Sequence, residues 1–88
     1  MAKYQIYFDT AAGQIMRNTE ILETELLGVV LGDLLAALKE EGYVLNGRGD
    51  PVVVHDGHLL DRGQTLPDQR VNPNEVLRVQ LMEIDGNG

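Results

Sequence analysis

The stretch that decides the fold covers residues 51–81 and reads PVVVHDGHLLDRGQTLPDQRVNPNEVLRVQL. Its first half predicts a β-hairpin, because Asp56-Gly57 lies between a β-branched run at 52–55 and a short return at 58–60. Both central positions of such a two-residue turn need a positive φ, which Asp-Gly adopts readily. Its second half is punctuated by prolines and asparagines and then predicts a final strand at residues 76–82.

The predicted final strand alternates between two faces, as expected for a strand with one buried side. Three aliphatic residues share one face, namely Leu77, Val79 and Leu81. The other face carries Val76, Arg78 and Gln80. The aliphatic face predicts the core side of a sheet, and the mixed face predicts its exposed side.

The N-terminal residues predict a second hairpin. Residues 3–9 alternate apolar and polar side chains, which predicts a half-buried strand. Residues 10–13 supply small side chains and a glycine for a turn, and residues 14–22 predict the returning strand. Two adjacent apolar pairs, Ile15-Met16 and Ile21-Leu22, do not fit strict alternation, so we expect a bulge or a long, irregular hairpin here.

The middle of the chain carries one helix signal. Residues 31–41 place leucines at helical spacing, contain two alanines, and are followed by a glycine that is a common stop. A longer helix capped by Thr24 is the alternative, but Gly28 and Gly32 would each cost about 1 kcal/mol in its interior. The sequence therefore favours the short helix, with residues 26–30 mostly as a connection.

Length and composition narrow the class of protein. The chain has 88 residues, which is enough for one domain with one modest core. It contains no cysteine, so neither a disulfide nor a thiolate is available. A net charge of −7 disfavours nucleic acid and anionic lipid and favours basic protein partners. These numbers exclude a large enzyme, a disulfide scaffold and a basic tail.

The sequence predicts neither export nor membrane insertion. Its start has one lysine and no apolar core of a signal peptide. The longest apolar stretch, residues 26–38, is interrupted by Asp33 and is too short to span a bilayer. We therefore expect a cytoplasmic location.

The predicted order of strand, strand, helix, strand, short strand and strand is that of the β-grasp fold, and residues 51–81 resemble the C-terminal half of ubiquitin without a gap. The matching positions are Gly57, Leu60, Gly63, Thr65, Leu66, Asp68, Val71 and the final strand at 77–81. The resemblance covers about a third of the chain. It implies an α+β, ubiquitin-like β-grasp fold, with a mixed four- to five-stranded sheet packed on one helix. The domain is expected at residues 1–84, with a flexible tail at 85–88.

The same resemblance implies a docking surface on the exposed face of the sheet. At the carried-over positions Val54 keeps an apolar centre, whereas Arg78 brings a charge and Gln80 replaces an apolar residue. Val52 and Met82 are expected to supply further apolar area. These five residues are the predicted partner-binding site. The alternative is a scatter of surface apolar residues, which is normal for soluble proteins.

The C-terminal residues bear on a second role, that of a protein modifier attached through its C-terminus. Ubiquitin-type modifiers and β-grasp sulfur carriers end in two glycines, because the tail enters a narrow channel of an activating enzyme where a Cβ would clash. Here Asp85-Gly86 stands where that pair would be, and Asn87-Gly88 follows. Gly86 and Gly88 are therefore the candidate conjugation residues, with an activating enzyme as the implied partner. The alternative is a loose end without a function of its own.

No catalytic or metal site is predicted. His55 and His58 flank the predicted hairpin turn, but the sequence suggests no third ligand, so we expect both to be solvated. The integrin-type tripeptide at residues 48–50 is expected to be an ordinary loop. The sequence shows no spacing typical of a nucleophile or of phosphate binding, so we expect no catalytic residue and no cofactor.

The resemblance favours a non-enzymatic protein-interaction module, similar to the small ubiquitin-like accessory proteins of bacterial type VII secretion. Protein partners are expected, whereas nucleic acid and membrane insertion are not. The first alternative is a protein modifier conjugated through its C-terminal glycine. A further alternative is a β-grasp subunit of a multicomponent oxygenase. A sulfur carrier is least favoured, because the tail lacks two adjacent glycines.

Overall fold

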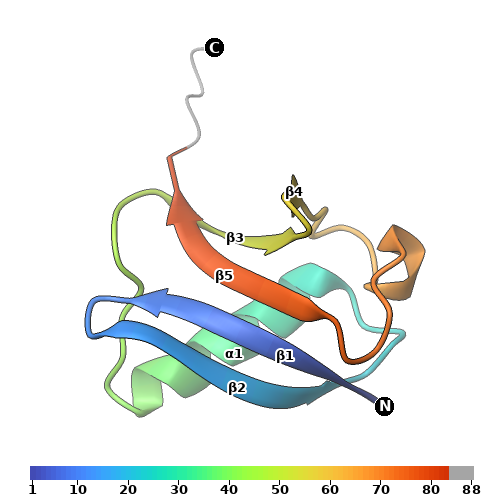
Figure 1. Ribbon diagram of the computed structural model, residues 1–88, viewed down its shortest axis with the longest axis horizontal. Coiled ribbons are helices and arrows are strands. Elements are labelled where there is room, and N and C mark those ends of the chain that lie inside the picture. The colour runs from blue at the N-terminus through green and yellow to red at the C-terminus, as the bar shows by residue number, and fades with distance from the viewer. Residues whose placement is uncertain (84–88) are drawn as a thin grey trace.

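The computed structural model of the protein describes residues 1–83 (Figure 1). In chain order the elements are β1 (Ala2–Thr10), β2 (Gly13–Ile21), α1 (Leu27–Glu40), β3 (Asp50–His55), β4 (His58–Leu59), the 3-10 helix η1 (Pro67–Gln69) and β5 (Val76–Met82). This is the order of strands and helix that the sequence predicts, and β5 has the predicted bounds. The candidate conjugation residues Gly86 and Gly88 lie outside the described residues.

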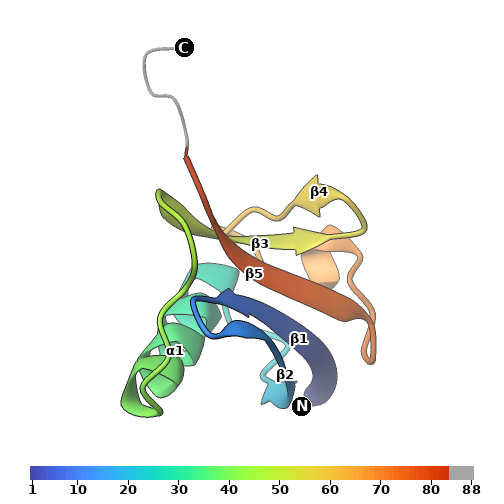
Figure 2. The same ribbon diagram turned by 60° about the vertical axis from the view of Figure 1, so that its left-hand side comes forward.

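The strands form one mixed sheet in the order β2-β1-β5-β3-β4. β1 and β5 run parallel, and the other neighbouring strands run antiparallel. α1 lies across one face, the inner face, and the opposite side is called the outer face below (Figure 2). The prediction of a mixed sheet packed on one helix is confirmed, with five strands.

The core lies between α1 and the inner face of the sheet. Alternate residues of β1 point into it, and Tyr4, Ile6 and Phe8 are fully buried. Leu77 and Val79 of β5 lie in the neighbouring strand and are equally buried. The helix contributes Leu27, Val30, Leu31 and Leu38. The predicted alternation of β1 and β5 is therefore correct, because side chains two residues apart on a strand share a face.

The first hairpin is regular, and the prediction of a bulge or an irregular hairpin is wrong. Its register runs without interruption from the pair of Ala2 with Ile21 to the pair of Thr10 with Gly13. In each adjacent apolar pair only one member points inward. Ile15 is partly buried against the core whereas Met16 is exposed, and Ile21 is buried whereas Leu22 is exposed. Adjacent residues of a strand point to opposite faces, so each pair places one apolar side chain on each side of the strand.

The helix begins at Leu27, four residues before its predicted start, so the assignment of residues 26–30 to a connection is wrong. The segment after β4 satisfies its first backbone donors. Leu27 N–H donates to Gln64 O and Gly28 N–H donates to Arg62 O, both at 2.9 Å. A Cβ on Gly28 would lie 3.3 Å from Arg62 O, so glycine permits this close approach. Local propensity missed the extra turn because its partners are more than thirty residues away.

α1 has 14 residues, with Leu27, Val30, Leu31 and Leu38 buried against the sheet and one glycine, Gly32, on its exposed side. None of the helices in residues 1–83 is long and apolar enough to cross a membrane.

The Gly32→Ala variant should be more stable than the natural protein, by about 0.5–1 kcal/mol. A Cβ at this position meets nothing within 4 Å, so alanine removes unfolded-state entropy without a steric cost. Urea unfolding followed by far-UV circular dichroism measures the change. The matched control is Gly28→Ala, which should gain less because its Cβ crowds Arg62 O. A lower unfolding midpoint for Gly32→Ala would contradict the placement of Gly32 at an open position inside the helix.

Candidate functional site

The structure places all five predicted binding residues on the outer face. They lie on β3 and β5, which are antiparallel neighbours with the pairs Val52–Gln80, Val54–Arg78 and Asp50–Met82. Val53 and Val79, which alternate with them, are buried on the inner face. Arg78 is exposed, and the other four residues are half-buried. The residues that the resemblance to ubiquitin implied therefore share one surface.

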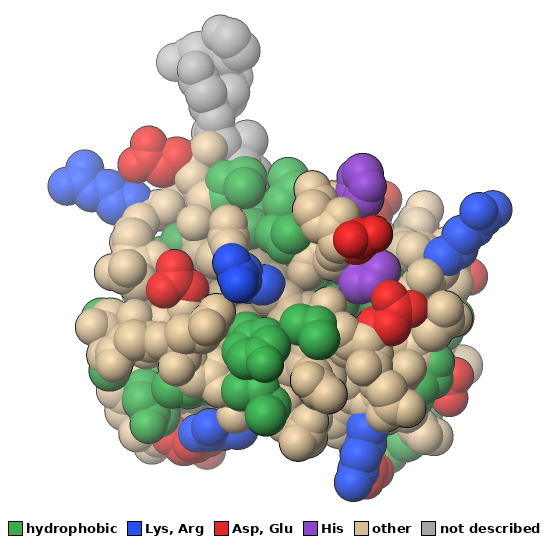
Figure 3. All heavy atoms as spheres, in the orientation of Figure 1, with side chains coloured by type: hydrophobic (Ala, Val, Ile, Leu, Met, Phe, Trp, Pro, Cys, Tyr) green, Lys and Arg blue, Asp and Glu red, His purple; other side chains and the backbone are tan. Residues whose placement is uncertain are grey.

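One row of side chains crosses all five strands of the outer face. The register pairs Met16 with Tyr7, Tyr7 with Arg78, Arg78 with Val54, and Val54 with Leu59. Directly paired residues lie about 5 Å apart, so neighbours in this outer-face row are in contact distance. Met16 and Leu59 are 41% and 54% exposed. In Figure 3, hydrophobic side chains gather in patches over the middle of this face, with a basic group between them.

Three members of the outer-face row were missed by the sequence analysis: Tyr7, Met16 and Leu59. Tyr7 does stand at an outward position of the predicted first strand, which is a signal that it belongs to the exposed face. Nothing in the sequence says that β1 lies directly beside β5, since residues 7 and 78 are far apart in the chain. The register between these two parallel strands is what joins the two halves of the surface.

A shallow hollow of about 340 Å³ lies beside the centre of the row. Its lining comes from β3, β5 and the turn after β3: Val54, Asp56, Gly57, Val76, Arg78 and Gln80. The wall is part apolar and part polar, and Arg78 is its one basic residue. A hollow of this kind suits one side chain of a partner, with hydrogen-bond donors available beside apolar contacts.

His55 is half-buried and paired, so the prediction that it is solvated is wrong. Its Nε2 atom lies against Glu75 Oε2, and the Asn72 N–H donates to Glu75 Oε1 at 2.9 Å. The bond from Asn72, together with the one from His55, holds the pKa of Glu75 below its ordinary value. The pair connects β3 to the loop that precedes β5. Only His58, which is exposed, fits the solvated interpretation.

Within residues 1–83 there is no group of three or more His, Asp or Glu side chains that could hold a metal ion. The His55–Glu75 pair joins two segments of the chain, β3 and the loop before β5. The outer face thus offers contact area and a guanidinium, which suits recognition.

Sequence comparisons give limited information. No model of a protein family matches the chain. Over 32 residues it is 44% identical to the β′ subunit of DNA-directed RNA polymerase from Neisseria meningitidis and from Neisseria gonorrhoeae. The matched segment is 36% of this chain, and the chain spans only 2% of the length of those subunits. The shared segment is too small a part of the subunit to carry its role.

Among solved structures, the fold is similar to the ubiquitin-like domain of EccD5 from Mycobacterium xenopi. The two structures superpose with a TM-score of 0.52, over 96% of this chain and 99% of that domain. Their sequences are 20% identical. This similarity therefore concerns the arrangement of helix and strands, and it agrees with the fold that the sequence implied.

Proposed function

Because this chain has the ubiquitin-like β-grasp fold, we propose that it is a non-catalytic module that binds other proteins through the outer face of its sheet. The observation that supports this proposal is the outer-face row, which crosses all five strands on the side away from α1. The resemblance to the small ubiquitin-like accessory proteins of bacterial type VII secretion supports the same role. A cytoplasmic location remains a prediction, which cell fractionation would test.

The side chains of the outer-face row indicate the chemistry of the partner surface that would fit them. Apolar side chains on both sides of Arg78 favour a partner patch that is apolar at its edges and presents a hydrogen-bond acceptor at its centre. Such a central arginine, enclosed by apolar contacts, is the arrangement in which truncation costs most binding energy. The net charge of −7 favours a partner that is basic outside this patch.

The Val54→Asp variant should lose the partner and keep its fold. An aspartate at position 54 would replace apolar contact area at the centre of the outer-face row with a charge. It would also pair with the Arg78 guanidinium directly opposite and withdraw it from the partner, so we expect at least a tenfold loss of recovered partner. The measurement uses protein tagged at its N-terminus and recovered from its own cells, with quantification of copurifying proteins by mass spectrometry. Circular dichroism of the purified variant checks the fold.

The matched control is Val44→Asp, which places the same charge on a side chain that is 63% exposed in the loop after α1. It should recover the partner as the natural protein does. Equal recovery with Val54→Asp would contradict docking through the outer face. An adduct that survives denaturation and disappears when residues 86–88 are deleted would instead favour the modifier alternative.

A further inference from the structure

Asn46 is followed directly by Gly47, in the loop that leads from α1 to β3. Both residues are exposed and lie outside the helices and strands. Among residues 1–83, neither the Gly47 N–H nor the Asn46 side-chain amide has a hydrogen-bond partner. A Cβ on Gly47 would meet nothing within 4 Å, so the space around this residue is open. The Gly47 nitrogen can therefore approach the Asn46 side chain.

Deamidation is the reaction that joins these two groups. The Gly47 nitrogen loses its proton to solvent and attacks Asn46 Cγ, and glycine has no Cβ to hinder the attack. The bond from Cγ to Nδ2 breaks, and ammonia leaves with a proton from water. The product is a five-membered succinimide ring that includes both residues. Water then opens this ring at one of its two carbonyl groups and gives either aspartate or isoaspartate, so water enters and ammonia leaves without a change of oxidation state.

The other asparagines of the described chain each lack one condition for this reaction. Asn72 precedes Pro73, which has no N–H to attack with. Asn74 precedes Glu75, whose N–H is bonded to the Asn72 carbonyl at 3.2 Å. Asn18 precedes a β-branched threonine within the regular pairing of β1 with β2. Within residues 1–83 the loop asparagine alone combines exposure, a following glycine and an unbonded amide.

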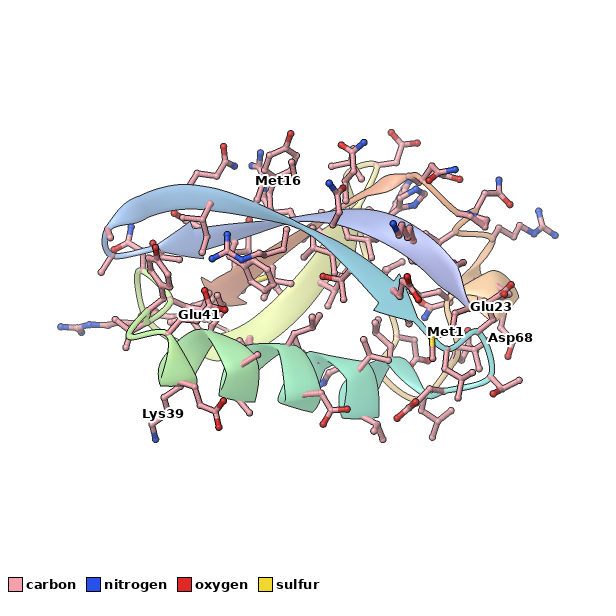
Figure 4. All side chains as sticks on the ribbon, turned by 90° about the horizontal axis from the view of Figure 1, so that it is seen from below. Met1, Met16, Glu23, Lys39, Glu41 and Asp68 are labelled. Carbon is pink, nitrogen blue, oxygen red and sulfur yellow. The ribbon has the colours of Figure 1, made fainter. Side chains whose placement is uncertain are left out.

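The loop around the dipeptide is anchored on both sides. Asn46 N–H donates to Asp9 O at 2.8 Å. Figure 4 shows the chain leaving the end of α1, near Glu41, and passing beside the turn of the first hairpin. On the other side Gly49 lies against the Met82 carbonyl, where β3 and β5 meet. Two residues separate these anchors, so a change in the length of the main chain between them is not absorbed locally.

We propose that Asn46 is a site of spontaneous modification, at which the folded protein converts to an isoaspartyl form. Isoaspartate carries the main chain through its Cβ and Cγ atoms, which adds one backbone atom before Gly49 and leaves a free α-carboxylate. The added atom moves Gly49 away from the Met82 carbonyl and opens the pair of Asp50 with Met82. The modified protein is therefore less stable. This inference does not depend on the proposed function.

The test incubates the folded, full-length protein at physiological temperature in mildly acidic and in mildly alkaline buffer, and then digests it with trypsin. Cleavage after Lys39 and Arg48 isolates Asn46 in peptide 40–48, apart from peptide 79–88, which holds the other Asn-Gly pair. We expect peptide 40–48 to lose ammonia and gain water at least about tenfold faster than peptides 18–39 and 71–78, because glycine leaves the attacking nitrogen unhindered. The rate should be higher in alkaline buffer, since the attacking amide must lose its proton.

Three variants sharpen the test. Asn46→Gln should leave peptide 40–48 unmodified, because ring closure from the longer side chain is much slower. Asn18→Gln is its matched control and should react at position 46 like the natural protein. Asn46→Asp, freshly prepared, carries the new carboxylate on a normal main chain. It should unfold close to the urea concentration of the natural protein, whereas the purified isoaspartyl protein should unfold at a lower one.

Three outcomes would overturn the proposal. In the first, Asn46 of the folded protein reacts no faster than Asn18 and Asn74. In the second, it reacts only in protein unfolded by urea, which would mean that the folded loop protects it. In the third, the isoaspartyl protein unfolds at the same urea concentration as Asn46→Asp, which would mean that the added backbone atom does not disturb the pairing of β3 with β5.

Discussion

The Gly49→Ala variant should lose about 3 kcal/mol or more of its free energy of unfolding. Gly49 has a φ of +108°, which L side chains rarely adopt. An added Cβ would overlap the carbonyl group of Met82, which is backbone and cannot rotate away. Relief of this overlap requires the start of β3 to separate from the end of β5, where Asp50 pairs with Met82. Urea unfolding measures the loss.

The matched control for this prediction is Gly47→Ala. Gly47 has a similar φ of +98°, but a Cβ there meets nothing within 4 Å. The Gly47→Ala variant should therefore lose only about 1 kcal/mol of its free energy of unfolding, which is the cost of holding alanine at a positive φ. Equal losses for the two variants would show that the β5 backbone does not approach Gly49 as closely as described. Neither glycine is buried, so burial alone would not separate them.

The Phe8→Ala variant should lose about 3–5 kcal/mol of its free energy of unfolding and be largely unfolded at 37 °C. Phe8 is 1% exposed, on the strand that both β2 and β5 flank. Its ring fills the space between the sheet and the C-terminal half of α1, where Leu38 is also buried. Its removal leaves a cavity that β1 cannot close, because its backbone is bonded on both sides. Thermal unfolding by circular dichroism measures the effect.

Met16→Ala is the control for the core prediction. Met16 is also on the first hairpin and also apolar, but it lies on the outer face and is exposed. Its truncation should change the free energy of unfolding by less than about 1 kcal/mol. If Met16→Ala proved as damaging as Phe8→Ala, the assignment of inner and outer faces would be wrong. The same variant then also reports whether Met16 contributes to partner binding.

Much of the fold could be predicted from local sequence. Asp56 and Gly57 have φ values of 50° and 80°, the positive values that the two-residue turn requires. The period-two patterns of β1 and β5 identified their buried faces, because strand geometry alone alternates side chains. Val52 and Val54 were placed on the exposed face by the resemblance to ubiquitin, and they lie there in the structure. The turn and the alternation depend on residues within a few positions of one another.

The first turn of the helix and the regular first hairpin could not be predicted in the same way. Two glycines argued against a helix start at Leu27, and they were outweighed by hydrogen bonds to Arg62 O and Gln64 O. The apolar pairs of β2 argued against a regular strand, because the outer face was assumed to be polar. At the helix start a distant partner outweighed a local preference, whereas β2 is regular because one of its outward positions, Met16, is also apolar.

The sequence by itself determined the order of strands, the turn between β3 and β4, and which side chains of β1 and β5 point out of the sheet. Tertiary structure alone decided which of those side chains are neighbours. The parallel register of β1 with β5 joins Tyr7 and Met16 to Val54 and Arg78, so residues of separate hairpins form one surface. The physical reason is that turns and alternation act over a few residues, whereas strand register and helix packing depend on contacts between segments remote in the chain.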